Sequence, residues 1–129
     1  MVDLNNTNQV SQMTESCQIL SDTLNMIENH VKPGQSVIEL DRLAEEYILS
    51  RDAKPAFKGY NNFPSTLTVS IDDEVVHGIP KDVVLEEGQI VGIDCGVLKN
   101  DYYSDSARTL AVGKISEEKQ SLLDIQKKH

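Results

Sequence analysis

The first part of the chain carries apolar residues at the spacing of two amphipathic helices. The first set recurs at steps of three and four residues: Cys17, Leu20, Leu24, Ile27 and Val31. Such steps place side chains on one face of an α-helix. The pattern predicts a helix over about 10–31 that ends before the helix-breaking sequence Lys32-Pro33-Gly34.

A second helix is predicted from a capping signal. Ser36 is followed three residues later by Glu39, the spacing of a capping box, in which each side chain accepts a hydrogen bond from the backbone N–H of the other residue. Apolar residues then continue at helical spacing: Leu40, Leu43, Ala44, Tyr47 and Ile48. We therefore expect this helix to run to about Ser50.

After this point the pattern changes from helical to strand-like. The segment "STLTVSI", residues 65–71, is rich in β-branched residues and alternates as a half-buried strand does. The segment "EVVHGIP", residues 74–80, is a second short apolar run, and residues 81–89 are predicted to be a connection. Two further runs, near 89–99 and 102–112, predict a β-hairpin.

The hairpin brings two aspartates into one register. Asn100 and Asp101 form the expected two-residue turn, because both residue types tolerate the positive φ that such turns need. This turn pairs Asp94 with Ala107 and places Asp105 two positions away on the same face. The two carboxylates then become diagonal neighbours on adjacent strands.

Converging carboxylates in an apolar hairpin require an explanation, because they repel unless they share a proton or a cation. Hard oxygen ligands suit divalent ions, and a bridging carboxylate is common in two-metal sites. The pattern alone leaves other possibilities open. Asp105 could pair with Arg108 or accept backbone hydrogen bonds, and Asp94 could cap a loop.

The end of the chain predicts a short third helix. Ser116 is a suitable N-cap, and Glu117 and Glu118 suit the positive end of the helix dipole. Leu122, Leu123 and Ile125 begin an apolar face. A helix of this length needs a partner on which to pack.

Composition narrows the class of protein. The 129 residues, 39% hydrophobic and 26% charged, fit one globular domain. A net charge of −9, without a Lys/Arg cluster, disfavours nucleic acid and anionic membrane as partners. We find neither a targeting pattern nor an apolar run of roughly 20 residues. We expect a cytoplasmic protein whose two cysteines, Cys17 and Cys95, are reduced and act as small apolar residues.

Other candidate residues precede the hairpin. His77 lies in the loop-like segment "VVHGIP", where it is either a neutral exposed histidine or a substrate contact. The aromatic residues Phe57, Tyr60 and Phe63 belong either to the core or to a binding pocket.

Three motifs together resemble a known family. The segments "FKGYNNFPSTLTVSIDDEVVHGIP", "LEEGQIVGIDCG" and "YYSDSARTLAVG" closely resemble type I methionine aminopeptidases, metallopeptidases of the pita-bread (creatinase/aminopeptidase-like) fold. "KPGQSVIELDRLAEEYI" is similar to the N-terminal helices of that family, and "EVVHGIP" distinguishes it from the related proline peptidases. The resemblance covers nearly all of this chain but only about the first half of the family's catalytic domain.

The resemblance implies a fold and a set of site residues. Residues 1–129 would form a truncated α+β pita-bread fold, with two N-terminal helices on an antiparallel sheet and a short C-terminal helix. Asp94 would chelate one of two divalent metal ions (Co, Mn, Fe or Zn), and Asp105 would bridge both. His77 would be catalytic, contacting the substrate near the scissile bond. The pocket for the methionine side chain would be lined by Tyr60, Phe63 and Thr68, with Phe57 nearby.

Two hypotheses follow from the incomplete match. In the first, the sequence belongs to a metal-dependent aminopeptidase that removes the N-terminal methionine from nascent proteins. This chain would be inactive alone, because the family's His ligand, two Glu ligands and second catalytic His come from the other half. In the second hypothesis the chain is a truncated, non-catalytic binding or interaction module, and its exposed apolar sheet face favours self-association, although the family is usually monomeric. A proline peptidase is disfavoured by "EVVHGIP".

Overall fold

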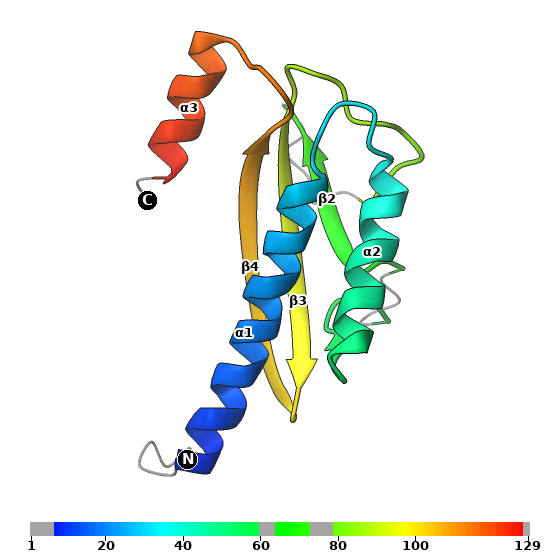
Figure 1. Ribbon diagram of the computed structural model, residues 1–129, viewed down its shortest axis with the longest axis vertical. Helices are drawn as coiled ribbons and strands as arrows, with labels where there is room; N and C mark the ends of the chain where they lie inside the picture. Colours follow the sequence, from blue (N-terminus) through cyan, green and yellow to red (C-terminus); the bar gives the residue numbers. More distant parts are fainter. Residues whose placement is uncertain (1–6, 60–63, 73–78, 128–129) are drawn as a thin grey trace.

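A computed structural model describes residues 7–59, 64–72 and 79–127. Within these ranges the chain forms three helices and four strands (Figure 1). In chain order they are α1 (Thr7–His30), α2 (Val37–Ser50), β1 (Lys54–Pro55), β2 (Leu67–Ile71), β3 (Ile90–Lys99), β4 (Tyr102–Ala111) and α3 (Glu117–Lys127). The predicted α+β arrangement, with two helices before an antiparallel sheet and a third helix after it, is confirmed.

Strand β3 is the centre of the sheet. It pairs with β4 along its whole length on one side. On its other side it pairs with β2 over residues 91–95 and with β1 over residues 97–98. All three pairings are antiparallel, and β4 follows β3 through the tight turn visible at the bottom of Figure 1. The predicted hairpin is therefore the longest element of the sheet.

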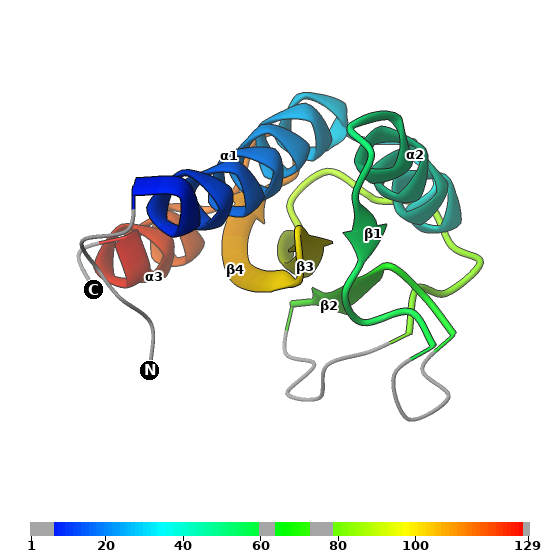
Figure 2. The ribbon, with the colours of Figure 1, turned by 90° about the horizontal axis from the view of Figure 1, so that it is seen from below.

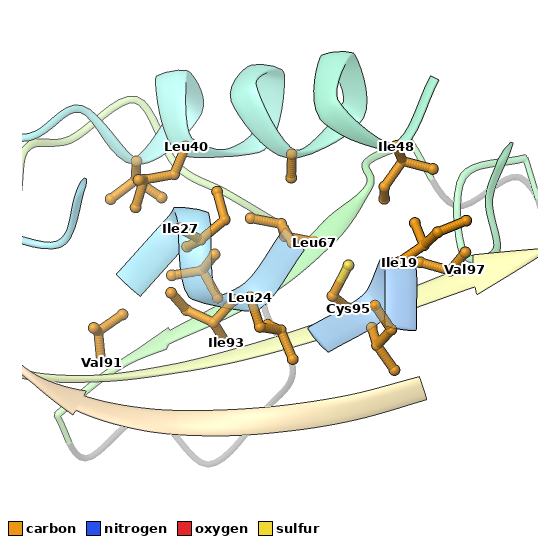
Figure 3. Packing of buried hydrophobic residues seen from close by; sticks show 14 of the residues in the cluster. Ile19, Leu24, Ile27, Leu40, Ile48, Leu67, Val91, Ile93, Cys95 and Val97 are labelled. Atoms are coloured by element: carbon orange, nitrogen blue, oxygen red, sulfur yellow. The ribbon is translucent and has the colours of Figure 1, made fainter. Parts of the chain in front are cut away.

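Helices α1 and α2 cover the same face of the sheet (Figure 2). Alternate residues of β3 point toward them and are fully buried: Val91, Ile93, Cys95 and Val97. In Figure 3 these side chains meet apolar residues from both helices, among them Leu24 and Ile27 of α1 and Leu40 and Ile48 of α2. The residues of β3 between them, such as Asp94, face away from the helices.

The predicted apolar face of α1 is partly wrong. Leu20, Leu24 and Ile27 are buried, but Cys17 is exposed, and the polar Ser16 is buried instead. The Ser16 hydroxyl lies 3.0 Å from the Tyr102 carbonyl oxygen, to which it donates a hydrogen bond. Because β4 offers polar groups at this point of the contact, a serine packs there rather than an apolar residue.

Helix α2 begins with half of the predicted capping box. The Ser36 hydroxyl accepts a hydrogen bond from the Glu39 backbone N–H at 3.2 Å, as predicted. The Glu39 carboxylate does not complete the box, because it accepts hydrogen bonds from the guanidinium of Arg42, one turn further along the helix. One of the two predicted cap interactions is thus confirmed.

The segment predicted as a connection, residues 81–89, is tied to the start of α2. The Leu85 backbone donates to Gln35 at 2.8 Å and accepts from Gly34 at 2.7 Å, and the Val37 N–H donates to the Val83 carbonyl at 3.0 Å. Leu85 is fully buried. The connection is therefore part of the packed structure, and it leads directly into β3.

Helix α3 starts as predicted, with the Ser116 hydroxyl accepting a hydrogen bond from the Lys119 N–H at 3.2 Å. Of its predicted apolar face Leu123 is buried, and the side chains of Leu122 and Ile125 lie outside the described part. None of the helices described is long and apolar enough to cross a membrane.

Candidate functional site

The turn of the hairpin sets the relative position of the two aspartates. Asn100 and Asp101 have φ values of 55° and 66°, as a type I′ turn requires. The register that follows pairs Asp94 with Ala107 and Gly96 with Asp105. The prediction that Asp94 and Asp105 are diagonal neighbours on one face of adjacent strands is therefore confirmed.

The two carboxylates line one small cavity on the sheet face opposite α1 and α2. The cavity has a volume of about 160 Å³ and is lined by Phe57, Asp94, Asp105, Ser106 and Ala107. Asp94 is partly buried and Asp105 is exposed. A small ligand in this cavity would meet two acceptor oxygen groups and one aromatic ring.

Thr68 of β2 is a neighbour of Asp94. The two residues are directly paired across β2 and β3. The Thr68 hydroxyl donates a hydrogen bond to Oδ2 of Asp94 at 3.2 Å. This bond restricts the rotation of the Asp94 carboxylate.

Phe57 reaches the cavity because residue 96 is a glycine. A Cβ atom placed on Gly96 would lie only 2.8 Å from Cε1 of the Phe57 ring. The ring therefore lies against the backbone of β3, at the residue paired with Asp105. Because Gly96 has no side chain, the Phe57 ring can pack between the strand and the solvent.

An ion pair of Asp105 with Arg108, the alternative that the sequence left open, does not form. Arg108 points to the helical face of the sheet, where its guanidinium donates to Asn25 Oδ1 at 2.7 Å and lies 3.5 Å from Glu28 of α1. Within the described part of the chain, no residue hydrogen-bonds with the Asp105 carboxylate. Its position is therefore not explained by a structural partner there.

The donor chemistry of the cavity fits a divalent cation in part. Two carboxylates are hard oxygen ligands of the kind such ions accept. Cys95, next to Asp94 in sequence, points into the core, and burial raises the pKa of its thiol to about 12, so it stays protonated at neutral pH. Among the residues described, no group of three His, Cys, Asp or Glu side chains could hold a metal. The described residues thus bring two carboxylates, Asp94 and Asp105, to the cavity as candidate metal ligands.

Four of the predicted site residues are brought together: Asp94, Asp105, Thr68 and Phe57. The other three, His77, Tyr60 and Phe63, lie outside the described residues. His30 is turned away from the site, because its Nδ1 lies 2.9 Å from the Met26 carbonyl oxygen on α1.

A larger hollow, of about 470 Å³, lies between β4 and α3. Its charged lining residues are Glu28 and Arg108, which pair with each other. It has no converging carboxylates, so its size does not make it the better candidate for metal chemistry.

One residue of the site region was missed by the sequence analysis. Asp41 occupies the apolar stripe of α2, at helical spacing from the buried Val37, Ala44 and Ile48. Its Oδ1 accepts hydrogen bonds from the backbone N–H groups of Thr66 at 2.9 Å and Leu67 at 2.8 Å. A charged residue that interrupts an apolar face was the signal that could have revealed it.

The fold defines the class of protein. The chain superposes on the crystal structure of methionine aminopeptidase from Rickettsia prowazekii with a TM-score of 0.89 and 32% identity, covering 97% of this chain and 50% of that one. A prolidase from Pyrococcus furiosus gives a TM-score of 0.78 at 25% identity, covering 92% of this chain and 34% of that one. The predicted pita-bread fold is therefore confirmed for the half that this chain spans.

Sequence comparison identifies the family. Residues 11–129 match the family model described as metallopeptidase family M24, and the chain belongs to this family. It is 45% identical over 128 residues to a methionine aminopeptidase from Clostridium acetobutylicum, covering 98% of this chain and 51% of that protein. The chain spans about half the length of the curated relatives it matches. The predicted resemblance to methionine aminopeptidases is confirmed.

Proposed function

We propose that residues 1–129 are the N-terminal half of the catalytic domain of a metal-dependent methionine aminopeptidase, which removes the N-terminal methionine from nascent proteins. The observation that carries the proposal is the hairpin register, which sets Asp94 and Asp105 around one cavity on the open face of the sheet. The similarity to methionine aminopeptidases supports the substrate.

Each site residue has a role in this proposal. Asp94 would chelate one divalent ion (Co, Mn, Fe or Zn), and Asp105 would be the ligand that two ions share. When bound, the ions supply Lewis acidity, which polarises the carbonyl group of the peptide bond. Thr68 orients the Asp94 carboxylate through its hydrogen bond. His77 contacts the substrate at the scissile bond, and Tyr60, Phe63, Thr68 and Phe57 hold the methionine side chain.

In this proposal the 129-residue chain alone lacks the ligands for a complete dimetal site. Two carboxylates do not complete the coordination of two ions, so we expect the 129-residue chain to release no methionine by itself. Its partner is the N-terminus of a peptide or nascent protein, and neither nucleic acid nor membrane takes part. Nascent chains place the activity in the cytoplasm.

A chimera tests the proposal. The chain is fused to the half of the Clostridium acetobutylicum methionine aminopeptidase that it does not match, and methionine release from a Met-initiated peptide is measured with added Mn²⁺ or Co²⁺. We expect turnover, and a loss of at least roughly 100-fold in Asp94→Asn and Asp105→Asn, since even outer-shell changes cost about 10–100-fold.

Asp101→Asn is the matched control, because Asp101 lies on the same hairpin but at the exposed turn, away from the cavity. It should keep the activity of the chimera. A chimera that unfolds cooperatively on heating yet releases no methionine with either metal would contradict the proposal. Full activity of the Asp94→Asn chimera would contradict it as well.

The outer edge of β4 favours a second candidate, a non-catalytic interaction module. Within the described residues β4 pairs only with β3, and its other edge borders the hollow beside α3. An unpaired edge strand of this length is a template for another chain. Analytical ultracentrifugation distinguishes the candidates: concentration-dependent self-association supports the module, and a monomer up to high concentration argues against it.

A further inference from the structure

We propose that Asp41 is a positioning residue for Asp94, acting through the start of strand β2 and the hydroxyl of Thr68. This inference rests on the proposed function, in which Asp94 is a metal ligand. Asp41 lies in the helical layer, whereas the carboxylate that it would orient lies on the opposite face of the sheet.

The first step is the contact between α2 and β2. A single carboxylate oxygen of Asp41 accepts two backbone N–H groups, from Thr66 at 2.9 Å and from Leu67 at 2.8 Å. Hydrogen bonds from amides to a carboxylate are stronger than those between neutral groups. Leu67 is the first residue of β2, so the clamp fixes where that strand begins relative to α2.

The second step runs along β2. Leu67 pairs with Cys95 and is fully buried, whereas Thr68 pairs with Asp94. Because side chains alternate along a strand, fixing Leu67 toward the helices turns Thr68 toward the cavity. From there its hydroxyl donates to Oδ2 of Asp94 at 3.2 Å.

β2 requires such a clamp because it is an edge strand. In the described part of the chain it pairs with β3 alone. Hydrogen bonds with β3 set the register of β2. The backbone N–H groups at the start of β2 that point away from β3 have no neighbouring strand, among those described, whose carbonyl groups could accept their hydrogen bonds. Asp41 is the acceptor there, at the cost of placing a carboxylate on the apolar face of α2.

NMR on the full 129-residue chain tests this inference through four variants. Asp41→Ala removes the clamp, and Asp41→Asn keeps one carbonyl oxygen as an acceptor. Thr68→Val removes the hydroxyl with little change of shape. Asp22→Ala is the matched control, because Asp22 is a helical aspartate whose carboxylate accepts from Arg51 and not from the backbone of β2. Amide exchange at Thr66 and Leu67 and the χ1 rotamers of Thr68 and Asp94, from three-bond couplings, are measured.

We expect Asp41→Ala to speed exchange at Thr66 and Leu67 by roughly 10-fold or more, as loss of a buried charged acceptor implies. It should also shift the χ1 rotamer populations of Thr68 and Asp94. Asp41→Asn should restore both properties, and Asp22→Ala should leave both unchanged. Thr68→Val should shift the χ1 rotamer populations of Asp94 while leaving exchange at Thr66 and Leu67 as in the parent.

The outcomes separate this inference from the proposed function. Unchanged χ1 rotamer populations of Asp94 in Asp41→Ala overturn it. Unchanged populations in Thr68→Val overturn it as well, and that variant remains informative if Asp41→Ala fails to fold. Mn²⁺ titration adds a second measurement, the broadening of the Asp94 and Asp105 amide signals, which should require several-fold more Mn²⁺ in Asp41→Ala. Absence of broadening in the parent chain contradicts metal binding by the two carboxylates alone, while the rotamers still decide the role of Asp41.

Discussion

The ring of Phe57 lies directly against the backbone of Gly96, with room for a hydrogen but not for a methyl group. A Cβ on Gly96 would be 2.8 Å from Cε1 of Phe57 and 3.1 Å from Cβ of Ala56. Both contacts come from the segment that follows β1, which pairs with the end of β3. This packing places an aromatic wall beside the two carboxylates of the cavity.

Gly96→Ala should therefore destabilise the chain and displace the Phe57 ring. The overpacked methyl group costs about 1–3 kcal/mol in the free energy of unfolding, measured by urea denaturation. Part of this cost should be recovered in the double variant Gly96→Ala/Phe57→Leu, because the smaller side chain can withdraw. A double-mutant cycle measures that coupling.

Gly92→Ala is the matched control for this prediction. Gly92 lies on the same strand and the same face, but its nearest neighbour, Cβ of Ser70, would be 3.9 Å from the new methyl group. An alanine there is an ordinary van der Waals contact and should change the free energy of unfolding by less than about 0.5 kcal/mol. Equal effects of the two substitutions would show that the contact with Phe57 is not the cause.

Ser16→Ala should destabilise the contact between α1 and β4. The buried hydroxyl donates to the Tyr102 carbonyl at 3.0 Å and lies 3.0 Å from the Ser104 hydroxyl. Its removal takes away the hydrogen bond to the Tyr102 carbonyl, which costs about 0.5–1.5 kcal/mol, while the Ser104 hydroxyl still donates to the Ser16 carbonyl at 3.1 Å. The neighbouring Cys17→Ala, at an exposed position, should be close to neutral in the same denaturation experiment. A neutral Ser16→Ala would contradict the importance of this hydrogen bond.

The same residues show where prediction from sequence stops. Helical spacing alone fits two adjacent faces of α1, one through Cys17 and one through Ser16. The choice depends on Tyr102 and Ser104, which lie more than eighty residues away in the chain. The polar Thr23 is buried on the same face, and its hydroxyl is satisfied locally by the Ile19 carbonyl at 2.7 Å. Periodicity therefore identified the helix, and long-range partners decided its inner face.

The candidate site likewise has one feature that follows from local sequence and two that depend on long-range packing. The relation of Asp94 to Asp105 follows from a two-residue turn, so it is local and could be predicted from the sequence. Neither the contact of Phe57 with Gly96 nor the clamp of Asp41 has a local signature of its geometry. Both join segments whose approach is determined by the packing of the whole sheet against the helices.

The pH dependence of stability should carry opposite contributions from two aspartates. Burial raises the pKa of Asp41 above its ordinary 3.8, against the effect of its two backbone hydrogen bonds. The hydrogen bond from Arg51 lowers the pKa of Asp22 below 3.8. The stabilising contribution of Asp41 is present below pH 3.8 and is lost as the pH rises through its folded-state pKa. The stabilising contribution of Asp22 is present above pH 3.8 and is lost as the pH falls through its folded-state pKa.

Two variants measure these contributions. Relative to the parent chain, Asp41→Asn should gain stability as the pH rises from about 3 to about 7, because its amide no longer ionises. Asp22→Asn should lose stability over the lower part of the same range. Urea denaturation at a series of pH values gives both differences. Parallel curves for the parent and Asp41→Asn would contradict the assigned direction of the Asp41 pKa.

The hairpin turn should be improvable, and the outcome tests the register that joins the two carboxylates. Asp101 has a φ of 66°, a conformation that glycine adopts without steric cost. Asp101→Gly should therefore raise the free energy of unfolding by roughly 0.5 kcal/mol, because relief of strain exceeds the added entropy of the unfolded chain. Asp101→Val should lower it by about 1–2 kcal/mol, since a β-branched residue resists positive φ. Equal stability of the two variants would show that the tight turn does not fix the pairing of Asp94 with Ala107.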